Sequence, residues 1–361
     1  MINLTVKTTL KTYPVYIGVG AIQQLPTLLK DNSFNFTKIF IITDETVGEL
    51  YLPTVLKSLS DFSVETIKVP SGEKAKSFDV YYECQTAALQ YKLDRHSLIL
   101  ALGGGAVGDL AGFVAATFMR GIPFIQIPTT ILAHDSAVGG KVAINHPAGK
   151  NMIGSFYQPE AVIYDTNFLV SLPIHEKRSG FAEVIKHSLI QDNSFYEWLK
   201  GNISTLNDFS EEELVRFLAR GIEIKSAIVA EDEKETGVRA YLNFGHTLGH
   251  AIEAELGYGK TTHGEAVLIG MLFALQLSKR YAGLQFETEP FYEWIHKLGY
   301  QIVLPKGLVF DQLIDRMKSD KKSIGQQIRM VLLKEIGKPL LFEFTEEEMQ
   351  LELEIFTKRG I

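Results

Sequence analysis

Short apolar runs alternate with helix-patterned segments over the first 170 residues. Strand-like runs of apolar and β-branched residues cover residues 38–44, 64–69, 97–102, 122–127 and 161–165. The segments between these runs have helical periodicity, as in residues 78–91 and in the Ala-rich stretch that ends near residue 118. Strands separated by helices predict a parallel sheet covered on both faces, with ligands bound at the carboxyl ends of the strands.

After residue 170 the pattern becomes helical. Helical periodicity runs to about residue 200 and returns in residues 211–231, 242–256, 265–282, 290–298 and 310–320. Residues 328–344 predict a β-hairpin, which an acidic helix follows. We therefore expect an α/β domain with a mainly parallel, Rossmann-like sheet in residues 1–170 and a mainly α-helical domain in residues 171–361.

The composition does not change the predicted fold, but it excludes several kinds of site and partner. The 361 residues are 46% hydrophobic and 22% charged, ordinary values for a soluble globular protein. A net charge of −7 without a Lys/Arg run gives no sign of a nucleic-acid partner. The single cysteine, Cys84, excludes an intrachain disulfide and a Cys-rich zinc motif. The chain has neither a window of 18 apolar residues nor a signal-peptide pattern, so we expect a cytoplasmic protein without a membrane partner.

Residues 103–108 match G-x-G-x-x-G between a predicted strand and a predicted helix. Glycines there let backbone N–H groups approach a diphosphate, and the helix N-terminus adds partial positive charge. The loop follows a later strand than in a standard Rossmann unit, and the next strand ends in Pro128-Thr129 without an acid for a ribose. Asp44, at the end of an earlier strand, could take that role. A glycine turn that only permits close helix–strand packing is the alternative.

Two glycine–lysine pairs follow, in Gly139-Gly140-Lys141 and Gly149-Lys150-Asn151. Backbone N–H groups and ammonium groups suit a small anion. Neither pair fits G-x-x-x-x-G-K-[ST], so nucleotide hydrolysis is disfavoured. Two surface hairpin turns with solvated lysines remain the alternative.

Three of the nine histidines, His246, His250 and His263, fall within 18 positions. His246 and His250 share one face of a helix at i, i+4, although H-E-x-x-H is absent. Hydrogen-bonded structural histidines are the alternative, but the acid two residues after His263 favours a divalent-metal site. Glu183 and Lys186 lie at i, i+3 amid apolar residues, which fits either a surface salt bridge or a half-buried, ligand-type carboxylate.

Several segments together resemble the 3-dehydroquinate synthase family. They occur in family order between about residues 40 and 325, and they are GGGAVGDLAGF, PTTILAHDSAVGGK, GKNMIGSFYQP, GFAEVIKH, EDEKETGVRAYLNFGHTLGHAIE and HGEAV. The resemblance implies an N-terminal domain that binds NAD, a C-terminal helical domain that carries Zn²⁺ or Co²⁺, and a homodimer. The substrate in the cleft between these domains would be 3-deoxy-arabino-heptulosonate 7-phosphate. Its conversion involves oxidation, phosphate elimination, reduction, ring opening and aldol closure, and NAD is regenerated in each turnover.

The resemblance also implies roles for individual residues. The metal ligands would be Glu183, His246 and His263, so that His250 passes to the substrate phosphate. Contacts to NAD would come from Asp44, Glu73, Lys76, Gly104, Gly105, Asp109, Thr129, Thr130, Lys141 and Lys150. The substrate pocket would be lined by Asp135, Lys141, Lys150, Asn151, Lys186, Lys225, Arg239, Asn243, His250 and Lys321, and Arg120 would reach the phosphate bound by the neighbouring subunit.

Within that pocket, Lys225 and Arg239 suit the substrate carboxylate, and the phosphate would meet Lys141, Asn151, Asn243, His250 and Lys321. One departure from the family concerns HDSAVGGK, which is a residue shorter than the form QVDSSVGGK and so bears on the placement of Asp135. Three other functions stay open: a metal-dependent polyol dehydrogenase, another sugar phosphate cyclase, and a non-catalytic NAD-binding module. The last of these predicts lost metal ligands or lost lysines, and none is missing.

Overall fold

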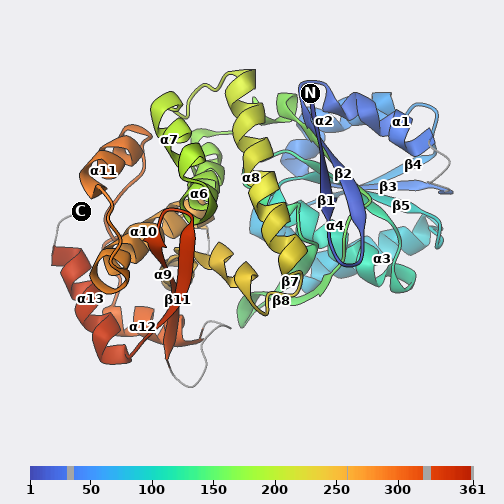
Figure 1. The fold of residues 1–361 in the computed structure, drawn as a ribbon. Helices are drawn as coiled ribbons and strands as arrows, with labels where there is room; N and C mark the ends of the chain where they lie inside the picture. Colours follow the sequence, from blue (N-terminus) through green and yellow to red (C-terminus); the bar gives the residue numbers. More distant parts are fainter. Residues whose placement is uncertain (31–35, 258, 320–326, 359–361) are drawn as a thin grey trace. The chain divides into compact units, whose positions relative to one another are not determined.

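The computed structural model describes residues 1–30, 36–257, 259–319 and 327–358, which divide into two compact units (Figure 1). The first unit comprises Met1–Leu172 with Ser210–Lys234, and the second comprises Pro173–Phe209 with Glu235–Ile361. Lys321 lies outside the described residues. None of the helices in the described ranges has the length and apolar character needed to cross a membrane.

A seven-stranded sheet forms the centre of the first unit, in the order β1-β2-β9-β6-β5-β3-β4. Its strands are β1 (Ile2–Lys7), β2 (Thr12–Gly18), β3 (Ile39–Asp44), β4 (Val64–Val69), β5 (Leu98–Gly103), β6 (Phe124–Pro128) and β9 (Ala161–Asp165). All neighbouring pairs are parallel except β1 with β2. The predicted mainly parallel sheet is therefore confirmed, and the antiparallel hairpin at its edge adds two strands that the apolar runs did not indicate.

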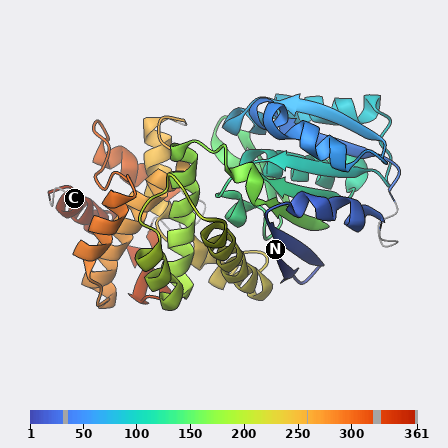
Figure 2. The ribbon, with the colours of Figure 1, turned by 90° about the horizontal axis from the view of Figure 1, so that it is seen from above.

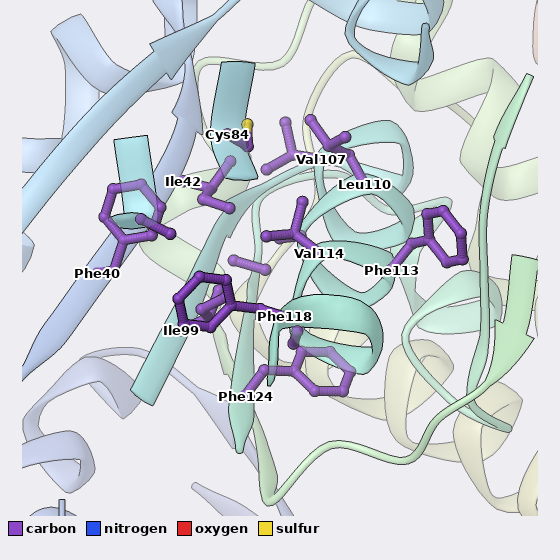
Figure 3. Close-up of a cluster of buried hydrophobic side chains, with 14 of the residues drawn as sticks. Phe40, Ile42, Cys84, Ile99, Val107, Leu110, Phe113, Val114, Phe118 and Phe124 are labelled. Atoms are coloured by element: carbon purple, nitrogen blue, oxygen red, sulfur yellow. The ribbon is translucent and has the colours of Figure 1, made fainter. Parts of the chain in front are cut away.

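Both faces of this sheet are covered, as expected for parallel strands. Side chains of β3 and β5 alternate between the faces: Phe40 and Ile99 pack with helices α3 (Phe78–Gln90) and α4 (Gly105–Thr117), as Figure 3 shows. Ile41 and Leu100 point to the other face and pack with α1 (Gln24–Lys30) and α2 (Glu45–Ser58). Because successive side chains point to opposite faces and both faces are buried, the sequence of each of these strands is one continuous apolar run.

Helix α8 (Glu211–Glu231) groups with the first unit, although residues 171–361 were expected to form one domain. It contacts β1 and β2, beside which it lies in Figure 2. A capping box of Ser210 and Glu213 begins the helix, and its apolar face includes Phe217 and Ile224. Helical periodicity locates that face but does not identify the element that it covers.

A second hairpin in the first unit joins β7 (Lys141–His146) to β8 (Gly149–Phe156). The two predicted glycine–lysine pairs lie where its strands begin, since Lys141 is the first residue of β7 and Gly149 the first of β8. The backbone of Asn151 is in the left-handed region, at a φ of 56°, which is uncommon outside glycine. Contacts described below hold this residue in place.

The second unit is mainly helical, as predicted. Its helices are α6 (Ile174–Gln191), α7 (Asn193–Asn202), α9 (His246–Leu256), α10 (His263–Leu277), α11 (Thr288–Lys297), α12 (Phe310–Ser319) and α13 (Glu346–Lys358). The predicted hairpin is present as β10 (Ile328–Glu335) and β11 (Lys338–Phe344). Helix α10 is buried along nearly its whole length and contacts α6, α9, α13 and β10. It is the central element of this unit.

Helix α9 begins at His246 rather than at the predicted residue 242. Gly245 has a φ of 82°, which interrupts the helix that the apolar pattern suggested. The preceding residues, Val238–Asn243, form a separate 3₁₀ turn. His246 consequently occupies the first position of α9.

Candidate active site

Polar residues of the first unit collect where parallel strands end. Asp44 ends β3, Gly103 ends β5, and Thr129 follows β6. Register pairs Thr43 with Leu102 and Gly103 with Pro128, so these ends lie at one edge of the sheet. Open α/β sheets bind ligands at this edge.

The glycines at the start of α4 let the side chains of Thr130 and Ser136 approach the backbone closely. A Cβ at Gly104 would lie 2.8 Å from Thr130 Cγ2, and one at Gly105 would lie 2.9 Å from Ser136 Oγ. The hydroxyl oxygens of Thr129, Thr130 and Ser136 are buried and make no hydrogen bond within the part of the chain that the structure describes. Donors grouped around a helix N-terminus suit a diphosphate, so the residues present fit NAD.

Asp44 is held in a fixed orientation at the end of β3. Its Oδ1 accepts hydrogen bonds from the Val47 backbone N–H and from the Ser71 hydroxyl, each at 3.0 Å. The first of these bonds caps α2. A carboxylate oriented in this way is suited to a ribose hydroxyl, and that role stays a prediction.

A buried network joins Lys76 to the β7–β8 hairpin. Lys76 Nζ lies 2.6 Å from Asp109 Oδ2 and donates to Asn151 Oδ1. Burial lowers the pKa of Lys76, but the carboxylates of Asp109 and Glu73 raise it by more, so its pKa is raised and the ammonium group stays charged. The network brings together two residues predicted to contact NAD and one predicted to contact the substrate.

Asn145 extends this network in two directions. Its Nδ2 donates to Glu73 Oε2 at 2.8 Å, and its Oδ1 accepts from the Asn151 backbone N–H at 3.0 Å. Glu73 also lies 4.0 Å from Lys150 Nζ. Asn145 therefore links a predicted NAD contact to the left-handed residue Asn151.

Four further predicted residues of the first unit are Asp135, Lys225, Lys141 and Arg120. Lys225 of α8 contacts Asp135, with 3.1 Å between Nζ and Oδ2, so these two predicted pocket residues lie together. Lys141 is exposed at the start of β7. Arg120 is exposed and has a φ of 70°.

Three helices of the second unit bring Glu183, His246 and His263 together. Glu183 Oε1 lies 3.6 Å from Nε2 of His246 and 3.6 Å from Nε2 of His263. Glu183 is 1% exposed, so the ligand-type alternative for this carboxylate describes its burial better than a surface salt bridge. One carboxylate and two imidazoles are a common set of zinc ligands, and the residues present fit a divalent metal.

His250 lies beside this group, because it is one turn after His246 on α9. Its ring centroid is 5.2 Å from that of His246 and 5.7 Å from that of His263. The ligand atoms of the three histidines lie within 4.8 Å of one another. Geometry alone therefore allows His250 as a ligand, and its assignment to the phosphate stays a prediction.

The pKa values of two histidines in this group are shifted in opposite directions. Burial holds the pKa of His246 well below its usual value, so its ring is neutral and can act as a ligand. Burial also lowers the pKa of His263, but the nearby carboxylates of Glu183 and Glu253 outweigh it and raise the pKa to about 10. His263 must therefore release one proton when it acts as a metal ligand.

The other predicted residues of the second unit that the structure describes lie on α6 or in the 3₁₀ turn that precedes α9. Lys186 Nζ pairs with Glu183 Oε2, and Lys186 is 1% exposed. Asn243 Nδ2 donates to Glu235 Oε1 at 2.8 Å, and Arg239 is buried in the same 3₁₀ turn. Glu235 was not predicted, although it lies in the segment that resembles the family.

Comparison with known proteins decides the family. Family models described as 3-dehydroquinate synthase N-terminal and 3-dehydroquinate synthase C-terminal match residues 66–179 and 180–323. The chain belongs to the 3-dehydroquinate synthase family. A 3-dehydroquinate synthase of Geobacillus thermodenitrificans (strain NG80-2) is 57% identical over 363 residues, covering 100% of this chain and 99% of that one. That of Bacillus cereus (strain AH820) is 52% identical and covers 99% of both chains.

A solved structure extends the family likeness to the fold. The crystal structure of 2-deoxy-scyllo-inosose synthase, complexed with carbaglucose-6-phosphate, NAD⁺ and Co²⁺, has a TM-score of 0.87. It is 26% identical to this chain and covers 98% of it and 99% of its own length. The α/β and helical parts predicted from the sequence thus correspond to a known sugar phosphate cyclase architecture.

Four polar residues of this 3-dehydroquinate synthase family member were missed by sequence reasoning. They are Ser136, Asn145, Glu235 and Glu253. Ser136, Glu235 and Glu253 do lie inside segments that resemble the family. Their contacts join different elements or cross turns, so helical or strand periodicity could not reveal them.

Proposed function

We propose that this chain is a 3-dehydroquinate synthase, a carbon–oxygen lyase of the shikimate pathway of aromatic amino acid biosynthesis. It would convert 3-deoxy-D-arabino-heptulosonate 7-phosphate to 3-dehydroquinate and phosphate. The observation that carries the proposal is the Glu183–His246–His263 group, in a chain 57% identical over its full length to a protein of that name. The glycine loop and its three buried hydroxyl groups add support from the first unit.

NAD and one divalent metal, Zn²⁺ or Co²⁺, are the proposed cofactors. When bound, NAD supplies a reversible hydride acceptor, and the metal supplies Lewis-acid polarisation of substrate oxygens. Gly104, Gly105, Thr129 and Thr130 would hold the diphosphate, and Asp44 a ribose. Glu183, His246 and His263 would hold the metal and leave coordination positions for substrate oxygens.

The chain's own residues would mainly bind and orient the substrate. A carbon next to a ketone loses a proton far more readily than one next to an alcohol, so elimination follows oxidation. Lys225 and Arg239 would bind the carboxylate. The phosphate, whose own oxygen can act as the base in the elimination, would meet Lys141, Asn151, Asn243, His250 and Lys321, with Arg120 contributed by a second subunit. Fixed orientation lowers the barrier without further groups that react.

The cations proposed for the substrate favour this proposal over a polyol dehydrogenase. A polyol has neither carboxylate nor phosphate, so it needs no set of separate cations. Lys225 and Arg239, the two cations proposed for the carboxylate, are both buried. From the family resemblance we further propose a homodimer, in which Arg120 would act across subunits, and a cytoplasmic location.

The discriminating experiment supplies purified protein with NAD and Co²⁺ and offers two substrates in parallel. The proposal predicts dehydroquinate from the heptulosonate phosphate and no NADH from glycerol. Glu183→Gln and His263→Ala should lose activity and bound metal together. Steady NADH formation from glycerol would support the dehydrogenase instead, and full activity with full metal content in both variants would refute the metal assignment.

A further inference from the structure

Glu253 makes a contact with His263 that neither the family resemblance nor the reaction assigns. Its Oε2 lies 2.8 Å from His263 Nδ1, across the junction between α9 and α10. Glu253 is 5% exposed, and it is seven residues after His246 on the same helix. Two helical turns separate these positions, so both side chains leave α9 on one face.

The two ring nitrogens of His263 face different carboxylates. Nδ1 meets Glu253, and Nε2 lies 3.6 Å from Glu183 Oε1. An imidazole that binds a cation through Nε2 must carry its proton on Nδ1. Glu253 is placed to accept that proton in a hydrogen bond, so that Nε2 can offer its lone pair to a cation that Glu183 also binds.

His246 shows the same division with a weaker acceptor. Its Nδ1 lies 3.3 Å from the Phe244 carbonyl oxygen, and its Nε2 is 3.6 Å from Glu183 Oε1. Both histidines are thus anchored at Nδ1 and converge on one carboxylate oxygen through Nε2. Only His263 has a charged acceptor, which forms a shorter and stronger hydrogen bond than a neutral one.

We propose that Glu253 is a positioning residue that fixes the tautomer and ring orientation of His263 for divalent-metal binding. The inference rests on the proposed function, which assigns the metal to Glu183, His246 and His263. A carboxylate that accepts from the distal nitrogen also makes the ligating nitrogen more basic, and loss of such a partner typically weakens metal binding by about 10–100-fold.

The test measures metal affinity directly, with Co²⁺ titrated into metal-free full-length protein against a competing chelator. Glu253→Ala should bind Co²⁺ about 10–100-fold more weakly than the wild type and give a changed visible absorption spectrum. Glu253→Gln should lose less affinity, because its amide oxygen can still accept from Nδ1. This nearly isosteric variant keeps the test valid even if the alanine variant fails to fold.

Glu255→Gln is the matched control on the same helix. Glu255 Oε2 lies 3.8 Å from Arg316 Nε, and its carboxylate has no part in the metal group described above. This variant should bind Co²⁺ with wild-type affinity. A comparable loss in Glu255→Gln would mean that any change on α9 disturbs the site, and the inference would be withdrawn.

Wild-type Co²⁺ affinity and spectrum in both Glu253 variants would also overturn the inference. The proposed function fails in a different way, namely if the wild-type protein releases no phosphate from the heptulosonate phosphate. If Glu253→Ala binds Co²⁺ more weakly but the wild type shows no turnover, the positioning role stands and the proposed reaction is refuted. If the wild type turns over but Glu253→Ala binds Co²⁺ as the wild type does, the proposed reaction stands and the positioning role is refuted.

Discussion

Gly264→Ala tests whether close packing of α6 on α10 sets the geometry of the metal group. Gly264 is next to His263, and its backbone N–H donates to the Ser179 hydroxyl at 3.1 Å. A Cβ at this position would lie 2.6 Å from the carbonyl carbon and 2.7 Å from the Cα of Ser179. Ser179 precedes Glu183 by one turn of α6, so the two helices that touch here carry two of the proposed ligands.

The magnitude follows from the contact distances. Ordinary van der Waals contact begins at 3.4 Å, so the contact with the carbonyl carbon alone requires the two backbones to separate by about 0.8 Å, and the Ser179 carbonyl oxygen, which would lie closer still, requires more. Backbone cannot rotate away as a side chain does, and overpacking of this kind typically costs about 1–3 kcal/mol. Metal–ligand distances tolerate only about 0.2 Å, so a shift of this size between Glu183 and His263 should weaken metal binding as well.

The assay combines thermal unfolding of the metal-free protein with Co²⁺ titration. Gly264→Ala should lower both the melting temperature and the Co²⁺ affinity. Gly201→Ala in α7 is the control, because a Cβ there meets nothing within 4 Å and its φ is not positive. That control should be neutral or slightly stabilising. Wild-type melting and Co²⁺ affinity in Gly264→Ala would refute the idea that this contact sets the ligand geometry.

Two further predictions concern the first unit. Glu233 is 8% exposed, and burial raises its pKa, but hydrogen bonds from Thr9 and Gln158 lower it by more. Because its folded-state pKa is below the ordinary value of about 4.3, ionised Glu233 stabilises the fold at pH values above 4.3, and this stabilisation is lost as the pH falls through the folded-state pKa. Urea unfolding should show Glu233→Gln about 1–3 kcal/mol less stable than the wild type at pH 7, and this difference should narrow below pH 4.3. A difference that does not change with pH would contradict the prediction. Asn145→Ala should lower kcat/KM because it removes the contacts with both Glu73 and Asn151, and Asn145→Asp should lower it as well because its carboxylate would face that of Glu73. Wild-type kcat/KM in both variants would argue against the link.

The strands of the first unit were predictable because parallel strands buried on both faces leave a clear apolar run. The predicted strand at residues 64–69 coincides with β4 (Val64–Val69). The edge hairpin β1–β2 was not predicted, because its partly exposed strands form no continuous apolar run; Ile2–Lys7 instead alternates apolar and polar residues, which is the pattern of a half-buried strand. Helix α8 was located with its observed bounds, but its packing on the first unit depends on contacts between distant segments.

Some features of the candidate site could likewise be predicted from local sequence, and others could not. His246 and His250 could be placed on one helix face from their spacing, which is a local property. Glu183 could be joined to His246 and His263 only through the family resemblance, because three separate helices carry them. Contacts made by Glu253 and Asn145 depend on side-chain placement across element junctions, and no periodic pattern encodes such placement.

The most direct test of the proposed function follows phosphate and NADH together in one reaction. Purified protein receives Co²⁺, excess 3-deoxy-D-arabino-heptulosonate 7-phosphate and an amount of NAD far below that of the substrate. If NAD is regenerated in each turnover, released phosphate should exceed the total NAD many times while NADH does not accumulate. Phosphate release that stops at one equivalent of NAD with matching NADH, or no phosphate release, would contradict the account.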